Sequence, residues 1–253
     1  MANGAQPLTP MTDAQAGGET LLPTMAWRSL RLMCRRSLAR HVDLTVEGLA
    51  HVPASGPVLL AARHFHHLYD GCAIGTVVPR HVHVLVAMDW VGHPLGRRAF
   101  ERACRAARFP VVIRPNAVAA HPELRAEAAH ALRRAATSTV ELLRTGHVVL
   151  VFPEGYPNVD PGPTPKTDDA SFLPFAPGFA RLVALAERDS GTRIPVLPVG
   201  LEYARGPRWR VTLRFGVPCY LADAPDRTTF IRDVEVRVRE LSGLASDLLT
   251  PDS

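Results

Sequence analysis

The fold is decided by the stretch Pro57-Val58-Leu59-Leu60-Ala61-Ala62-Arg63-His64-Phe65-His66-His67-Leu68-Tyr69-Asp70-Gly71. Its first six residues form a continuous apolar run, which predicts a buried strand. Three histidines and one aspartate then follow within seven positions, and a glycine closes the cluster. Because α/β proteins place their chemistry at the carboxyl ends of strands, this turn is a candidate active site.

The chemistry of the turn follows from its residue types. Imidazole is the side chain whose unperturbed pKa lies near neutrality, and a neighbouring carboxylate can fix its tautomer and raise its basicity. A histidine beside Asp70 would therefore serve as a general base. The alternative at this point is a solvated loop that is rich in histidine without further purpose.

Length and charge narrow the class of protein. The 253 residues are enough for one sizeable α/β domain or two small ones. The net charge of +5 suits a membrane surface, a phosphorylated substrate or a nucleic acid. Aromatic residues make up only 6% of the chain and no nucleic-acid-binding motif is visible, so we expect no nucleic-acid partner.

The cysteines and the apolar runs exclude several other classes. None of the four cysteines belongs to a CxxC pair, so we expect neither a metal site nor a disulfide framework, and a reducing compartment fits. No apolar run is long enough to span a bilayer, and no secretory signal is visible at the N-terminus.

The chain before the predicted domain divides into two parts. Residues 1–24 lack periodicity and are expected to be a disordered tail. Residues 25–42 predict a basic amphipathic helix, with Trp27 and other apolar residues at helical spacing among five arginines. This helix either lies in a membrane interface or packs on the domain with its arginines in water.

Residues 43–253 are expected to form a single domain in which strands alternate with helices. The predicted strands are 43–48, 57–62, 81–88, 109–115, 147–152, 194–200 and 209–215, and the predicted helices are 72–78, 95–108, 121–145, 177–188 and 227–249. This order predicts an α/β fold with a mixed, mostly parallel sheet flanked by helices. The prolines of strand 194–200 suggest an edge or an irregular position.

Polar residues mark the ends of the predicted strands, where an open sheet gathers its functional groups. Besides the histidine cluster, Arg114 ends one strand and Glu154-Gly155 ends another. An arginine offers a fixed cation for a phosphate, and a glutamate with a glycine offers a hydroxyl acceptor and close backbone approach.

The order of these blocks resembles the glycerolipid acyltransferase family, the group similar to lysophosphatidic acid acyltransferases. The family carries a His-(four residues)-Asp block, a block ending in Arg, a Phe-Pro-Glu-Gly block and an aliphatic block with two prolines. The last three correspond here to residues 109–114, 152–155 and 194–199. The resemblance covers about residues 44–220.

Two departures from the family pattern stand out. The residue five positions before Asp70 is Phe65, where the family has its histidine. The base is therefore either His64, which directly follows the strand, or His66, which would share a helical face with Asp70. His67 is a neighbour in the turn. In addition, Tyr156-Pro157-Asn158 stands where the family commonly has Thr-Arg-Ser, which leaves Arg114 as the candidate cation for an acceptor phosphate.

The resemblance implies an acyltransferase that moves a fatty acyl group from an acyl-CoA or acyl-carrier-protein thioester to a hydroxyl of a lysophospholipid or related lipid. The catalytic residues would be His64 or His66 with Asp70, while Arg114, Glu154 and Gly155 would position the acceptor; no metal or bound cofactor is implied. The enzyme would lie peripherally on the cytoplasmic face of a membrane. The alternative is a non-catalytic lipid-surface binding protein with a degenerate acyltransferase fold.

Overall fold

The structure is a computed structural model of the chain and describes residues 21–88, 91, 93–188 and 190–244. Its helices are α1 Leu21–His41, α2 Tyr69–Val77, α3 Pro94–Ala106, α4 Pro115–Ala120, α5 Arg125–Arg144, α6 Gly178–Glu187 and α7 Arg227–Leu241. Its strands are β1 Val42–Glu47, β2 Val58–Ala62, β3 Val82–Val84, β4 Val86–Ala87, β5 Val111–Val112, β6 Val148–Val151, β7 Val196–Ala204 and β8 Trp209–Phe215.

The main sheet has six strands in the order β1-β8-β7-β2-β6-β3. Only the pairing of β7 with β8 is antiparallel, so the sheet is mixed and mostly parallel, as predicted. Central strand β2 is apolar throughout because both its faces are covered: Leu60 belongs to the core on one face, and Leu59 to the core on the other.

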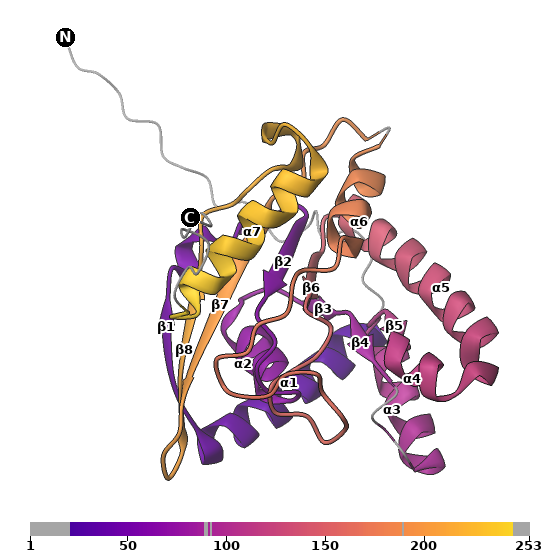
Figure 1. Cartoon of the computed structure of the whole chain (residues 1–253), viewed down its shortest axis with the longest axis vertical. Coiled ribbons are helices and arrows are strands. Elements are labelled where there is room, and N and C mark those ends of the chain that lie inside the picture. The colour runs from indigo at the N-terminus through magenta and orange to yellow at the C-terminus, as the bar shows by residue number, and fades with distance from the viewer. Residues whose placement is uncertain (1–20, 89–90, 92, 189, 245–253) are drawn as a thin grey trace, which may run out of the picture.

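Helices cover both faces of the sheet. Helices α1 and α2 contribute to one core, and α5, α6 and α7 to the other. Figure 1 shows α7 crossing one face of the sheet. The close approach of α7 requires Gly200, because a Cβ there would lie 2.3 Å from the backbone of Leu241.

Helix α1 begins at Leu21, so the last four residues of the expected tail, 21–24, are helical; residues 1–20 lie outside the described part. The helix packs on α2 through Trp27 and Leu38, which are buried. The thiols of Cys34 and Cys72 also meet between these two helices, 2.9 Å apart.

Two segments are divided where one element was expected. The expected strand 81–88 forms β3 in the main sheet and β4 in a separate pair with β5. The division arises because the backbone of this segment forms hydrogen bonds with β6 as far as Leu85, and with residues 110–112 from Val86 onward. The expected helix 121–145 begins only at Arg125, because Pro122 keeps His121 out of the helical conformation (φ −132°, ψ 78°).

Of the two positions predicted for the proline-containing strand, an edge or an irregular position, the edge is wrong, since β7 lies between β8 and β2. Pro198 is tolerated there because the ladder with β8 begins only at Val199. The carbonyl of Pro198 accepts the N–H of Gly216 (2.8 Å), in the turn that follows β8.

The closing helix is also shorter than expected. Helix α7 ends at Leu241 instead of residue 249, and Gly243 follows in a left-handed conformation (φ +70°) that is typical of a helix terminus. Residues 245–253 lie outside the described part.

Candidate active site

The histidine turn and the Glu154 turn lie together because they follow adjacent parallel strands. Strand β2 ends at Ala62 and β6 at Val151, and the two strands are paired in parallel. The backbone N–H of His64 donates to Oε1 of Glu154 (2.8 Å), which joins the two turns directly. The expected gathering of functional groups at this edge of the sheet is therefore present.

His64 is the histidine that the structure pairs with Asp70. Its Nδ1 lies 2.9 Å from Oδ2 of Asp70, and the carboxylate is fully buried. A carboxylate accepts hydrogen bonds, so the ring donates from Nδ1 and keeps Nε2 as its basic nitrogen. The ring stacks on Phe152, with centroids 4.2 Å apart, which fixes its plane.

Four donors hold the Asp70 carboxylate. Oδ2 accepts His64 and the backbone N–H groups of Phe65 (2.6 Å) and His66 (2.9 Å). Oδ1 accepts the hydroxyl of Tyr203 (2.6 Å). Burial raises the pKa of Tyr203 well above its ordinary value, so this hydroxyl remains a donor.

The spacing of six residues between His64 and Asp70 is accommodated by Phe65. The Phe65 side chain turns into the interior, where it is 1% exposed and stacks on Tyr203 with a centroid separation of 4.3 Å. Because its backbone N–H bonds Asp70, the extra residue folds around the carboxylate instead of moving His64 away from it.

His66 has a different environment from the one a base requires. Its Nδ1 accepts the backbone N–H groups of Leu68 (3.2 Å) and Tyr69 (3.4 Å), at the start of α2. Burial lowers the pKa of His66 to about 4, so the ring is neutral and caps the helix. His67 is exposed, and its Nδ1 lies 3.2 Å from the carbonyl oxygen of Val159.

Glu154 is fully engaged within the chain. Oε1 accepts the N–H of His64, and Oε2 accepts the N–H of Leu173 (2.9 Å) and pairs with Lys166 (2.6 Å). This differs from the expectation that Glu154 binds an acceptor hydroxyl: in the structure it holds the backbone of the base. Gly155 follows with φ +77°, and this left-handed turn leads the chain away from β6.

Lys166, like Tyr203, is a residue of this site that the sequence did not predict. Its ammonium donates to the carbonyl of His64 (2.6 Å) and to Oδ1 of Asn158 (3.0 Å), in addition to Glu154, and its side chain is 0% exposed. A signal was present: it is the only lysine in a chain with 29 lysines and arginines together. A compact ammonium with three donors matches three converging acceptors, which a planar guanidinium does not.

Arg114 is also committed to an internal partner. Its Nη1 lies 2.7 Å from Oδ2 of Asp160, and both side chains are buried. The guanidinium lies over the ring of Tyr156, 5.0 Å from the centroid. This differs from the expectation of a cation that is available to an acceptor phosphate.

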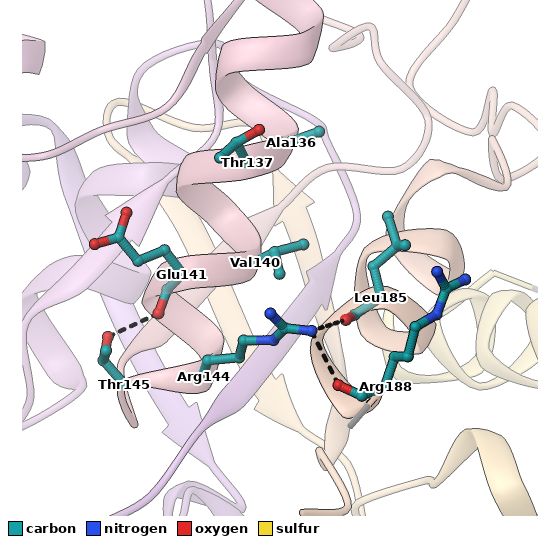
Figure 2. A pocket seen from close by; sticks show the side chains of 8 residues that line it. All are labelled: Ala136, Thr137, Val140, Glu141, Arg144, Thr145, Leu185 and Arg188. Atoms are coloured by element: carbon teal, nitrogen blue, oxygen red, sulfur yellow. Dashed lines mark hydrogen bonds between the residues drawn. The ribbon is translucent and has the colours of Figure 1, made fainter. Parts of the chain in front are cut away.

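A hollow lies away from the histidine turn. A groove of about 590 Å³ between α5 and α6 is lined by residues that include Arg144 and Thr145 (Figure 2). These residues come shortly before β6 and therefore lie near its amino end, whereas His64 follows the carboxyl end of the parallel strand β2. Arg144 donates to the carbonyls of Leu185 (2.8 Å) and Arg188 (2.9 Å) and so closes the end of α6. The groove is a feature of helix packing.

The described residues contain neither a metal-binding cluster nor a membrane-spanning helix. No group of three or more metal-ligating side chains is arranged to hold a metal ion in that part of the chain. Within the same residues, every helix is too short or too polar to cross a membrane.

Comparison with known proteins identifies the family. A family model described as Acyltransferase matches residues 43–202, more than half of the chain. The crystal structure of the 1-acyl-sn-glycerophosphate (LPA) acyltransferase PlsC from Thermotoga maritima has the same fold, with a TM-score of 0.60 and 19% identity over 86% of this chain and 78% of that one. Curated protein sequences give no significant match. The resemblance seen in the motif blocks is confirmed, and the chain belongs to the acyltransferase family.

Proposed function

We propose that the protein transfers a fatty acyl group from an acyl-CoA or acyl-carrier-protein thioester to a hydroxyl of a lysophospholipid or a related lipid. The observation that carries the proposal is the contact of 2.9 Å between His64 Nδ1 and Asp70 Oδ2 at the carboxyl end of β2. A family of acyltransferases needs a base for the acceptor hydroxyl, and this pair supplies one.

The chemistry follows from the tautomer that Asp70 imposes. Nε2 of His64 takes the proton of the acceptor hydroxyl while the oxygen attacks the thioester carbonyl. The tetrahedral intermediate then expels the thiolate, which takes the proton from the imidazolium, so the products are an ester and a free thiol. The negative charge of Asp70 faces the ring throughout, as in a hydrolase triad without the serine.

Helix α1 is the candidate for membrane attachment. Seven of its exposed residues, named here the Met/Arg face, combine apolar and basic side chains: Met25, Arg28, Leu32, Met33, Arg35, Arg36 and Arg40. The opposite side of the helix packs on the domain through Trp27 and Leu38. The two alternatives for this helix are therefore compatible, and we propose that the Met/Arg face lies on anionic lipid while the buried side anchors the domain.

The alternative of a non-catalytic binding protein rests on the unusual spacing of His64 and Asp70 and on Tyr156-Pro157-Asn158 in place of Thr-Arg-Ser. The spacing does not separate the two side chains, so it does not favour the alternative. The assay below tests the alternative, because a binding protein would show no turnover.

The test is an assay of thiol release and ester formation with purified full-length protein, acyl-CoA and lysolipids in mixed micelles. Turnover that requires both substrates, and that falls at least about a hundredfold in Asp70→Ala, is expected when a base loses the group that orients it. The reasoning fails if Asp70→Ala turns over at the rate of the unaltered protein. An Asp223→Ala variant, changed at an exposed carboxylate, is the control.

A further inference from the structure

The buried charges of the site balance one another. Among the described residues, the buried basic side chains other than histidine are Arg63, Arg114 and Lys166. Lys166 pairs with Glu154, and Arg114 pairs with Asp160, whose side chain is 2% exposed. With Asp70, the buried set among the described residues contains three carboxylates and three cations.

The third cation, Arg63, is held by the backbone. Its guanidinium donates to the carbonyls of Leu201 (3.1 Å) and Asp169 (2.7 Å) and is 2% exposed. Burial lowers the pKa of Arg63, while the charges of Glu154 and Asp70 oppose that shift, so carboxylates of the chain already stabilise its charge.

The Arg114–Asp160 pair stands beside the histidine turn. Val159, the neighbour of Asp160, exchanges backbone hydrogen bonds with this turn: its N–H donates to the carbonyl of Phe65 (2.7 Å), and its carbonyl accepts the N–H of His67 (3.0 Å). For an anionic group next to the reacting hydroxyl, the charge of Arg114 would therefore already be neutralised by Asp160.

A phosphate monoester beside the reacting hydroxyl would bring about two negative charges into this balanced set. Burying an anion is costly unless a cation pairs with it. A phosphate that paired with Arg114 would take it from Asp160, and one that paired with Lys166 would take it from Glu154. In either case the carboxylate released would be a buried group without a partner.

We propose that the acceptor is a lipid whose hydroxyl has uncharged surroundings, such as a monoacylglycerol or a glycolipid, rather than a lysolipid with a phosphate monoester. This inference rests on the proposed acyl transfer and defines its acceptor. Asp160 is the specificity-determining residue, because it neutralises Arg114, and its neighbour Val159 is bonded to the histidine turn.

The experiment compares two acceptors that differ only by the phosphate: a monoacylglycerol and the lysophosphatidic acid of the same acyl chain, each with one acyl-CoA and the full-length protein. An alkyl glucoside is the third acceptor and distinguishes a sugar lipid from a glycerolipid. We expect kcat/KM for the better uncharged acceptor to exceed that for lysophosphatidic acid at least tenfold.

Asp160→Asn tests the cause. The amide keeps the oxygen that accepts the N–H of Gly162 but removes the charge that neutralises Arg114. We expect kcat/KM for lysophosphatidic acid to rise at least tenfold relative to that for the uncharged acceptor. Asp223→Asn is the matched control: it removes the same charge from an exposed pair with Arg193 and should leave the ratio unchanged.

The outcomes separate this inference from the proposed function. Equal or better use of lysophosphatidic acid by the unaltered protein overturns the inference and leaves acyl transfer standing. An Asp160→Asn variant that still acylates the uncharged acceptor but shows no change in ratio also overturns it, since Asp160 then does not set the preference. Thioester use that no acceptor stimulates overturns the proposed function and the inference together.

Discussion

Replacement of Lys166 by methionine should destabilise the protein and disable the site together. The ammonium is buried and bonds Glu154 Oε2, the carbonyl of His64 and Oδ1 of Asn158. Lys166→Met fills similar space but leaves a buried carboxylate without its cation. Breaking a buried ion pair in this way typically costs about 3–5 kcal/mol. The carbonyl oxygen of His64 also loses its hydrogen-bond donor, which adds to this cost. We expect a loss of at least about 3 kcal/mol in the free energy of unfolding.

A double-mutant cycle isolates the pair. Glu154→Gln together with Lys166→Met removes both charges and keeps an amide oxygen for the N–H of His64, so the double variant should be more stable than the sum of the single changes predicts. A coupling energy of about 2 kcal/mol or more is expected. Lys166→Arg should not restore stability, because a planar guanidinium does not match three converging acceptors.

The measurement is urea unfolding of the full chain followed by circular dichroism, with kcat measured on the same samples in native buffer. The reasoning is refuted if Lys166→Met unfolds within about 1 kcal/mol of the unaltered protein, the level of ordinary substitutions. It is also refuted if Lys166→Arg is as stable as the unaltered protein, because the site would then need only a charge.

Three further predictions concern pH, the Asp70 network and the membrane. Burial lowers the pKa of His66 to about 4 and that of His83 to about 3, from an ordinary 6.5. Below about pH 6.5 the unfolded chain therefore binds more protons than the folded chain. The free energy of unfolding, measured in urea, should fall by roughly 2 kcal/mol per ring between pH 7 and pH 5. Tyr203→Phe removes the hydroxyl bonded to Asp70 and should lower kcat about tenfold or more with little change in KM. Met33→Glu on the Met/Arg face should weaken binding to anionic vesicles about tenfold or more in sedimentation.

Each of these predictions has its control. His83→Gln, which does not titrate, should remove about half of the loss between pH 7 and pH 5, and an unchanged slope contradicts the assignment. A rise in KM with an unchanged kcat for Tyr203→Phe contradicts a positioning role. Leu132→Glu on α5 alters a side chain as exposed as Met33 (61% against 67%) and should not change vesicle binding; equal losses in both variants would show that the Met/Arg face is not the attachment site.

The sequence predicts the central strands of the sheet well, because burial on both faces requires an uninterrupted apolar run. The runs that became β2 and β6 are apolar without interruption, and a strand buried on both faces must be. Local proline chemistry was harder to interpret. The prolines predicted an edge or an irregular position, yet Pro198 lies in an interior strand. It is tolerated there because, at this point of β7, the neighbour on one side is the turn after β8 and not a paired strand.

The site was predictable where its residues directly follow strands, and not where they depend on distant partners. His64 follows β2 and Glu154 follows β6, and the parallel pairing of these two strands places the two residues side by side. Tyr203 lies 133 positions from Asp70 and Lys166 lies 102 positions from His64. Neither belongs to a local pattern: strand β7 brings Tyr203 to the site, and the loop after β6 brings Lys166. The choice between the two candidate bases also depended on where Phe65 turns, which spacing does not reveal.

The central claim is that His64, oriented by Asp70, is the base of acyl transfer. The direct measurement is kcat for thioester-dependent ester formation in His64→Ala and in His66→Asn, which keeps an oxygen for the cap of α2. Both variants should unfold cooperatively, His64→Ala should lose about a hundredfold or more in kcat, and His66→Asn should stay within about tenfold of the unaltered protein. A folded His64→Ala variant that retains full turnover, or a folded His66→Asn variant that loses it, would contradict the account.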